Sequence, residues 1–217
     1  MERIEKLLKS EDPVKWLFTG DSITHGALHT YGKRDYVQIF EERLRYEIGK
    51  GRDAVIRTAV SGWQSRTILD DIDWNILQYK PDFVSIMVGM NDATQGIGYL
   101  DTFTSNMNSI IDQAEAASGA VVVLNTTNPI DTGGDPSREP ALPGINECIR
   151  DIAAKRGLLL VDHNKFWLES WEQNPLRKLQ WVDDPIHPND FGHKAMAKLL
   201  LKELGMWDDN SICCTML

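Results

Sequence analysis

Cysteine is scarce in this sequence of 217 residues, with only Cys148, Cys213 and Cys214. An odd number, with two of the three adjacent near the end, does not form a disulfide framework. We therefore expect a reduced, cytoplasmic protein, although the cysteines alone leave open secretion directed by an upstream signal. The segment 207–217, which holds two of the cysteines, is predicted to be a flexible tail, since chain ends are the parts that most often lack fixed structure.

Long hydrophobic runs are also missing. No apolar stretch approaches the roughly 18 residues that a membrane-spanning helix needs. The first 13 residues, MERIEKLLKSEDP, are amphipathic and charged, and they lack the apolar core of a secretion signal. The sequence predicts no membrane partner.

Positive charge is in deficit, because 23 Lys and Arg stand against 32 Asp and Glu, which gives a net charge of −9. A surface of this sign repels the phosphate backbone of nucleic acids. We therefore expect no nucleic-acid partner.

What the sequence does contain is an alternation of short apolar runs with amphipathic segments, which is typical of a parallel α/β sheet. A length of 217 residues suits one domain, 1–217, with a core over about 14–206. We predict an α/β fold, a flavodoxin-like three-layer α/β/α sandwich with a central parallel sheet of about five strands. The expected strands are 14–20, 54–60, 82–89, 119–127 and 158–163, and the expected helices are 35–48, 66–78, 101–117, 141–156 and 190–204.

Polar residues with complementary chemistry follow these strands. Because ligands gather beyond the carboxyl ends of parallel strands, these residues are predicted to meet at one edge of the sheet. The Ser22 hydroxyl can act as a nucleophile, with His187 as its base and Asp184 orienting the imidazole. Backbone N–H groups of Ser22 and Gly62 and the side-chain amide of Asn91 can together hold a developing oxyanion.

Four short blocks carry this pattern in chain order: GDSI at 20–23, SGWQS at 61–65, GMND at 89–92 and DPIHPN at 184–189. They resemble the motifs of the SGNH hydrolases, the GDSL-type esterase and lipase superfamily, and the frame that they span covers nearly the whole chain. The resemblance implies a serine esterase with Ser22, His187 and Asp184 as its triad and Ser22, Gly62 and Asn91 as its oxyanion hole. It also implies an acyl-enzyme intermediate and no metal or other cofactor.

Each of these residues also has a purely structural interpretation. Ser22 could cap the following helix, Asn91 with Asp92 could form an Asx turn, and Gly62 could serve a tight turn. His25 and His29, close to Ser22, are expected to be solvated or to cap a helix. A zinc site is disfavoured because the spacing of its candidate ligands matches no helical pair; the candidates are His163, Asp183, Asp184, His187 and His193.

The loops that follow the strands are rich in amides and hydroxyls, which favours a polar substrate over a long acyl chain. We expect Trp63 and Trp181 to contact a sugar ring and Asp21 to contribute to substrate binding, whereas Trp16 and Trp74 are predicted to lie in the core. The predicted substrate is a short-chain ester, chiefly an acetyl ester, on a sugar or oligosaccharide. Short-chain thioesters or lysophospholipids remain alternative substrates, and a non-catalytic carbohydrate-binding protein is an alternative of another class. The apolar residues of 165–171 leave open a homo-oligomer.

Overall fold

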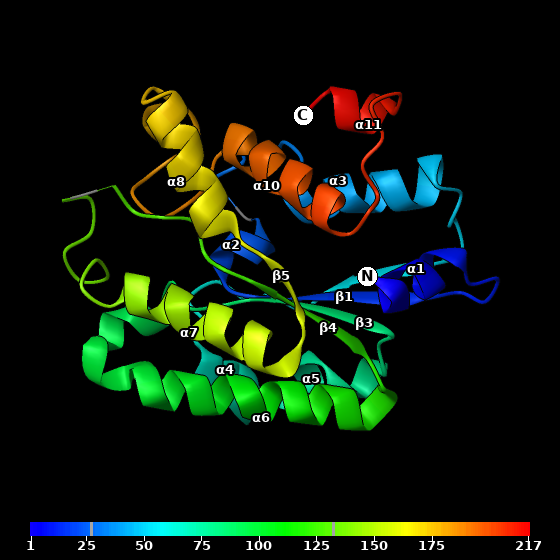
Figure 1. Cartoon of the computed structure of the whole chain (residues 1–217), viewed down its shortest axis with the longest axis horizontal. Helices are drawn as coiled ribbons and strands as arrows, with labels where there is room; N and C mark the ends of the chain where they lie inside the picture. Colours follow the sequence, from blue (N-terminus) through cyan, green and yellow to red (C-terminus); the bar gives the residue numbers. More distant parts are fainter. Residues whose placement is uncertain (27, 132) are drawn as a thin grey trace.

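The computed structural model describes residues 1–26, 28–131 and 133–217. Its centre is a five-stranded sheet in which every pair of neighbouring strands is parallel, in the order β2-β1-β3-β4-β5 (Figure 1). This order reverses direction between β1 and β3, which is where ligands bind in doubly wound sheets. The strands are β1 (Lys15–Gly20), β2 (Ala54–Arg57), β3 (Phe83–Met87), β4 (Val121–Asn125) and β5 (Leu159–Val161).

Helices cover both faces of the sheet, so the predicted three-layer α/β fold is confirmed (Figure 1). One layer holds α4, α5, α6 and α7, and the opposite layer holds α3, α8, α10 and α11. Their bounds are α3 (Tyr36–Glu42), α4 (Ser65–Asp70), α5 (Ile72–Asn75), α6 (Leu100–Ser118), α7 (Leu142–Arg156), α8 (His163–Gln173), α10 (Asp190–Glu203) and α11 (Ile212–Thr215). Shorter or peripheral helices are α1 (Glu2–Lys9), α2 (Ser22–His25) and α9 (Arg177–Gln180), with a π turn at Arg43–Glu47 and 3-10 turns at Leu77–Tyr79, Asp92–Gln95 and Ile97–Tyr99.

The helix predicted over 66–78 is divided, which corrects the prediction. Asp71 leaves helical geometry between α4 and α5, with φ −118° and ψ 36°. The break lets Asn75, which is fully buried, reach the sheet, where its side-chain oxygen accepts hydrogen bonds from the hydroxyls of Thr19 and Thr58. A continuous helix pattern gives no sign of this tertiary contact.

The flexible tail predicted over 207–217 is also wrong. Ser211 caps α11 by accepting from the backbone N–H of Cys214, and the N–H of Cys213 donates to Glu47 at 2.9 Å. Cys214 is 1% exposed, and burial raises the pKa of the Cys213 thiol to about 11. Both cysteines therefore act as small apolar residues that hold α11 against the π turn.

The apolar runs that predicted the central strands are buried on both faces. Trp16 and Phe18 of β1 pack against Phe83 of β3 and Phe40 of α3, with ring centroids 4.9–5.8 Å apart. Within the described ranges, no helix has the length and apolar composition to cross a membrane.

The end of β1 approaches β3 so closely that only glycine fits there. A Cβ on Gly20 would lie 1.9 Å from the carbonyl oxygen of Met87, and Gly20 has φ +153°. This contact sets where the chain leaves the sheet toward Asp21 and Ser22.

We predict that Gly20→Ala lowers the free energy of unfolding by about 3 kcal/mol, because the backbone must move away from β3 or adopt a strained geometry. Gly32→Ala is the matched control: its φ is +76°, and no described heavy atom lies within 4 Å of the added Cβ. It should lose only about 1 kcal/mol. Urea unfolding followed by circular dichroism measures both, and equal losses would contradict the close-approach explanation.

Candidate active site

The loop after β1 presents the hydroxyl of Ser22. Asp21 is the N-cap of α2 and accepts from the N–H of Ile23 at 3.0 Å. The helix ends after one turn at Gly26, which has φ +70°. Because Asp21 supplies the cap, the capping interpretation of Ser22 is wrong, and its hydroxyl is left to bond with His187.

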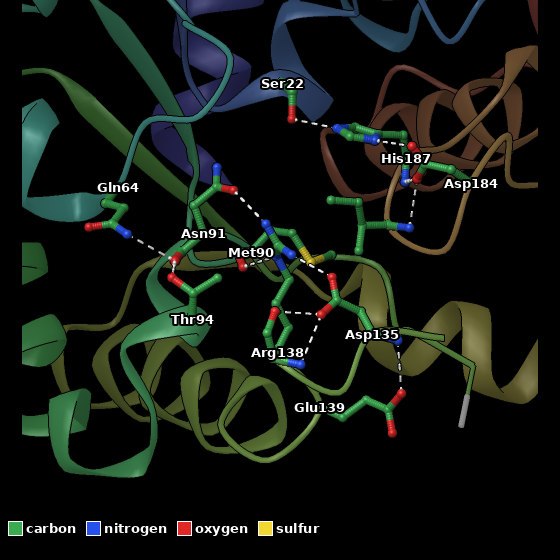
Figure 2. Close-up of polar contacts among 12 residues, drawn as sticks. Ser22, Gln64, Met90, Asn91, Thr94, Asp135, Arg138, Glu139, Asp184 and His187 are labelled. Carbon is green, nitrogen blue, oxygen red and sulfur yellow. Dashed lines mark hydrogen bonds and ion pairs between the residues drawn. The ribbon is translucent and has the colours of Figure 1, made fainter. Parts of the chain in front are cut away.

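Ser22, His187 and Asp184 form one hydrogen-bonded row (Figure 2). Ser22 Oγ lies 2.9 Å from His187 Nε2, and His187 Nδ1 lies 2.7 Å from Asp184 Oδ2. The other oxygen of Asp184 accepts from the backbone N–H groups of Ile186 and His187 at 2.9 and 2.8 Å. The turn itself therefore holds the carboxylate beside the imidazole. Asp183, the neighbouring candidate, points instead to His29 and Tyr31.

The surroundings of His187 keep its ring neutral near pH 7. Burial lowers the pKa of His187 below its ordinary value, against the opposing pull of Asp184, and His29 and Arg138 lower it further. Burial alone would raise the pKa of Asp184, but the hydrogen bonds from His187 and the turn hold it below its usual range. The arrangement is a neutral imidazole that can accept a proton beside a carboxylate that stays ionised.

The loops after β2 and β3 bring Gly62 and Asn91 to the same edge of the sheet. Gly62 has φ +84°, and in the described part of the chain nothing stands within 4 Å of where a Cβ would lie. The Asn91 amide donates one N–H to the carbonyl of Trp63 at 3.1 Å. Behind it, Asp92 accepts from the N–H and the hydroxyl of Ser65, which ties the two loops together.

Arg138 is a residue of this site that the sequence did not reveal. Its guanidinium donates to the Asn91 side-chain oxygen at 3.3 Å and to the Met90 carbonyl at 3.1 Å, and it pairs with Asp135 (Figure 2). A donor on the oxygen and an acceptor on the nitrogen fix the orientation of the Asn91 amide. Arg138 lies in the irregular stretch 128–144, where no periodicity marks one residue above another.

The predicted substrate residues lie in different places. Trp63 is half-buried beside Asn91 and packs edge-on against Trp74, whose 45% exposure corrects its prediction as a core residue. The indole of Trp181 packs on Phe166 and Trp167, and it lines a cavity of about 400 Å³ between α8, α9 and α10. Asp21 is fully buried, so the prediction that it contacts substrate is wrong.

The histidines also lie in different environments. His163 and His193 lie in the interior, where burial lowers their pKa values to about 3 and about 4. His193 accepts from the N–H of Tyr36 at 3.4 Å, as a structural residue of α10. His25 bonds Ser61, but His29, expected to be solvated or capping, lies face to face with His187.

A model of the GDSL-like lipase/acylhydrolase family matches residues 18–195 of the chain. The chain belongs to this family. The resemblance read from the four sequence blocks is confirmed, and the protein is a carboxylic ester hydrolase. The match includes all three members of the row from Ser22 to His187 in this esterase.

Other proteins are similar to this esterase over nearly their whole length. An acetylxylan esterase of Geobacillus stearothermophilus is 24% identical over 208 residues, which cover 88% of this chain and 94% of the relative. The crystal structure of Axe2, an acetylxylan esterase from the same organism, superposes with a TM-score of 0.76, covering 91% of this chain and 97% of that one at 24% identity. LAE5, an α/β hydrolase from the metagenome of Lake Arreo, has a TM-score of 0.76 at 21% identity, covering 90% and 97%.

Asp21, next to Ser22 in the chain, is a buried carboxylate whose charge is only partly compensated. Burial raises its pKa to about 7, and Asp92 adds to the rise, although the Ile23 N–H and Arg138 oppose it. One of its oxygens has no hydrogen-bond partner among the described residues. Since the folded protein holds this proton more tightly than the unfolded chain, stability falls as the pH rises from the ordinary pKa of 3.8 to about 7, and it levels off above that.

We predict that Asp21→Asn reduces the loss of stability with rising pH. Relative to the wild type, the free energy of unfolding of the variant should increase by on the order of 2–3 kcal/mol between about pH 5 and about pH 8, because the amide does not ionise. Denaturant unfolding at the two pH values measures this difference. Asp70→Asn, on the exposed face of α4, is the control and should follow the wild type. Parallel curves for Asp21→Asn and the wild type would contradict the raised pKa.

Proposed function

We propose that this esterase hydrolyses short acyl esters, chiefly acetyl esters on carbohydrates, through a triad of Ser22, His187 and Asp184. The observation that carries the proposal is the unbroken row of hydrogen bonds from Ser22 Oγ through His187 to Asp184, with distances of 2.9 and 2.7 Å. Nucleophile, base and orienting carboxylate at hydrogen-bond distance are the arrangement that acyl transfer requires.

In the acylation step, Ser22 Oγ attacks the ester carbonyl and His187 Nε2 takes the hydroxyl proton. Asp184 stabilises the imidazolium that forms, because its carboxylate stays ionised. The tetrahedral intermediate then collapses, the bond to the alcohol breaks, and His187 returns the proton to the departing oxygen. Water, activated by the same imidazole, attacks the acyl-Ser22 ester and releases the carboxylic acid.

The negative charge on the carbonyl oxygen needs donors that are already in place. We assign this role to the backbone N–H groups of Ser22 and Gly62 and to the amide of Asn91. The Trp63 carbonyl uses only one of the two N–H hydrogens of that amide, so one remains for the oxyanion. Arg138, through the Asn91 oxygen, keeps this hydrogen directed. Preorganised donors of this kind are the largest single term in many acyl-transfer enzymes.

The loop that follows Gly62 supports a carbohydrate ester as substrate. Trp63 and Gln64 come directly after Gly62, and Gln64 donates to the Asn91 carbonyl at 3.0 Å. An indole face beside amide groups suits a sugar ring, so we propose Trp63 as a sugar contact. The acetylxylan esterase that matches this chain over 88% of its length supports the same substrate class.

We predict that activity on p-nitrophenyl esters falls from acetate through butyrate to octanoate, and that the protein releases acetate from acetylated xylo-oligosaccharides. Ser22→Ala should lower kcat by at least about 10³-fold, because no nucleophile remains. Ser105→Ala, on the exposed face of α6, is the matched serine control and should retain full activity.

Other outcomes assign a different function. Preference for octanoate, or for an acyl thioester, would replace the acetylesterase by a lipase or thioesterase. Binding of the oligosaccharide without hydrolysis would indicate a carbohydrate-binding protein. Full activity in Ser22→Ala would disprove the triad.

Arg138→Met provides a separate test of the oxyanion hole. Removing the guanidinium frees the Asn91 amide to rotate, so kcat should fall by roughly tenfold with little change in KM, because the lost contact acts in the transition state. Arg66→Met, which removes an exposed arginine paired with Asp70, is the control. A change confined to KM would show that Arg138 acts on substrate binding instead.

A further inference from the structure

The imidazole of His29 lies parallel to that of His187. Their ring centroids are 3.7 Å apart and the two planes differ by 5°. His29 comes from the loop between α2 and α3, seven residues after Ser22 in the sequence, and both rings border a narrow gap beside Ser22. His29 transfers no proton in the proposed mechanism, so proton transfer does not account for its contact with His187.

A second carboxylate holds His29 in this position. Its Nδ1 lies 2.8 Å from Asp183 Oδ2, and the hydroxyl of Tyr31 donates to the other oxygen of Asp183. Asp183 and Asp184 are neighbours in the chain, and each is bonded to Nδ1 of one imidazole. Two Asp–His pairs therefore lie one upon the other, and only His187 reaches the serine at hydrogen-bond distance.

The backbone of the loop adopts an unfavourable conformation on both sides of His29. Leu28 and Tyr31 have φ values of 65° and 52°, and in the described ranges they are two of the three non-glycine residues with positive φ. Such conformations cost free energy and persist where the surroundings impose them, often at functional sites. In this loop, residues with such conformations flank His29, and the His29 ring and the Tyr31 hydroxyl bond to the two different oxygens of Asp183.

We propose that His29, oriented by Asp183 and Tyr31, is a positioning residue that holds the ring plane of His187 during catalysis. The inference rests on the proposed function, since it assigns His187 the role of base. His187 must keep Nε2 directed first at Ser22 and then at the departing alcohol oxygen. Asp184 holds the Nδ1 edge of the ring, but the bond from Nε2 to Ser22 is given up during the reaction, which leaves rotation about the Cβ–Cγ bond less restricted. A flat ring stacked on its face limits this rotation.

His29 also brings a titratable group against the base. The groups around the two rings are Asp183 at 2.8 Å and Asp184 at 3.8 Å from His29 Nδ1, with Tyr31, His193 and Arg138 acting at longer range. A proton on His29 opposes a proton on His187, so it helps keep the base neutral. The effects of ring stacking and of charge at His29 can be separated by His29→Phe, because phenylalanine retains the flat ring and carries no titratable proton.

The test compares His29→Ala and His29→Phe by kcat, KM and the pH dependence of kcat/KM on p-nitrophenyl acetate. His29→Ala loses the stacked ring, so kcat should fall roughly tenfold with KM changed less than about twofold. His29→Phe should recover most of kcat at alkaline pH. In both variants the acid limb of kcat/KM should move to higher pH, since His187 is then protonated more easily.

Three further variants complete the design. Asp183→Asn and Tyr31→Phe weaken the support of the ring and should give smaller losses in kcat than His29→Ala. His25→Ala removes a histidine whose Nδ1 lies 3.0 Å from Ser61 Oγ, and it should match the wild type. If His29→Ala proves thermally unstable, His29→Phe and Tyr31→Phe carry the test through the acid limb and kcat.

Wild-type kcat and an unmoved acid limb in His29→Ala would overturn the inference. So would a loss in His29→Ala that phenylalanine does not restore, because the stacked ring would then not be what positions His187. Ser22→Ala separates this from failure of the proposed function: if that variant is inactive while the His29 variants behave as the wild type, only the positioning role is refuted.

Discussion

The parallel pairing of β1 with β3 is the constraint on which the site depends. It places the carboxyl ends of the two strands side by side, so the loop that carries Ser22 and the loop that carries Asn91 open at the same edge of the sheet. The contact of Gly20 with the Met87 carbonyl brings these ends as close as the backbone allows. The order of the strands in the sheet reverses at this point. The segment around His187 reaches Ser22 here, at the carboxyl ends of the strands.

The row of polar groups that depends on this pairing costs folding free energy. The row crosses a sequence separation of 165 residues between Ser22 and His187. Asp21, which caps the helix that begins at Ser22, is buried and its charge is only partly compensated, and the loop of His29 contains two residues with positive φ. Costs of this kind concentrate at functional sites, where the surrounding fold must stabilise them. The aromatic cluster of β1, β3 and α3 contributes to that stability.

Hydrogen bonds from neighbouring residues also fix the orientation of the side chains in the site. Backbone N–H groups of the turn hold Asp184, Arg138 holds the Asn91 amide, and Asp183 holds His29. Each of these hydrogen bonds restricts the rotation of the side chain that it holds. The geometry of the site is therefore a property of loops from separate parts of the chain and not of any single motif.

The sequence by itself determined the fold class, the five strands and the family, because alternating apolar runs and four ordered polar blocks are local patterns. It also selected Ser22 and Asn91, which follow two of those runs, and Asp184 and His187, which precede the last long helix. Only the tertiary structure decided the contacts of Arg138 and His29, the burial of Asp21, the placement of Trp181 at a cavity between α8, α9 and α10, and the packing of α11. Each of these depends on contacts between residues far apart in the chain, and periodicity and propensity carry no information about which loops meet once the sheet has formed.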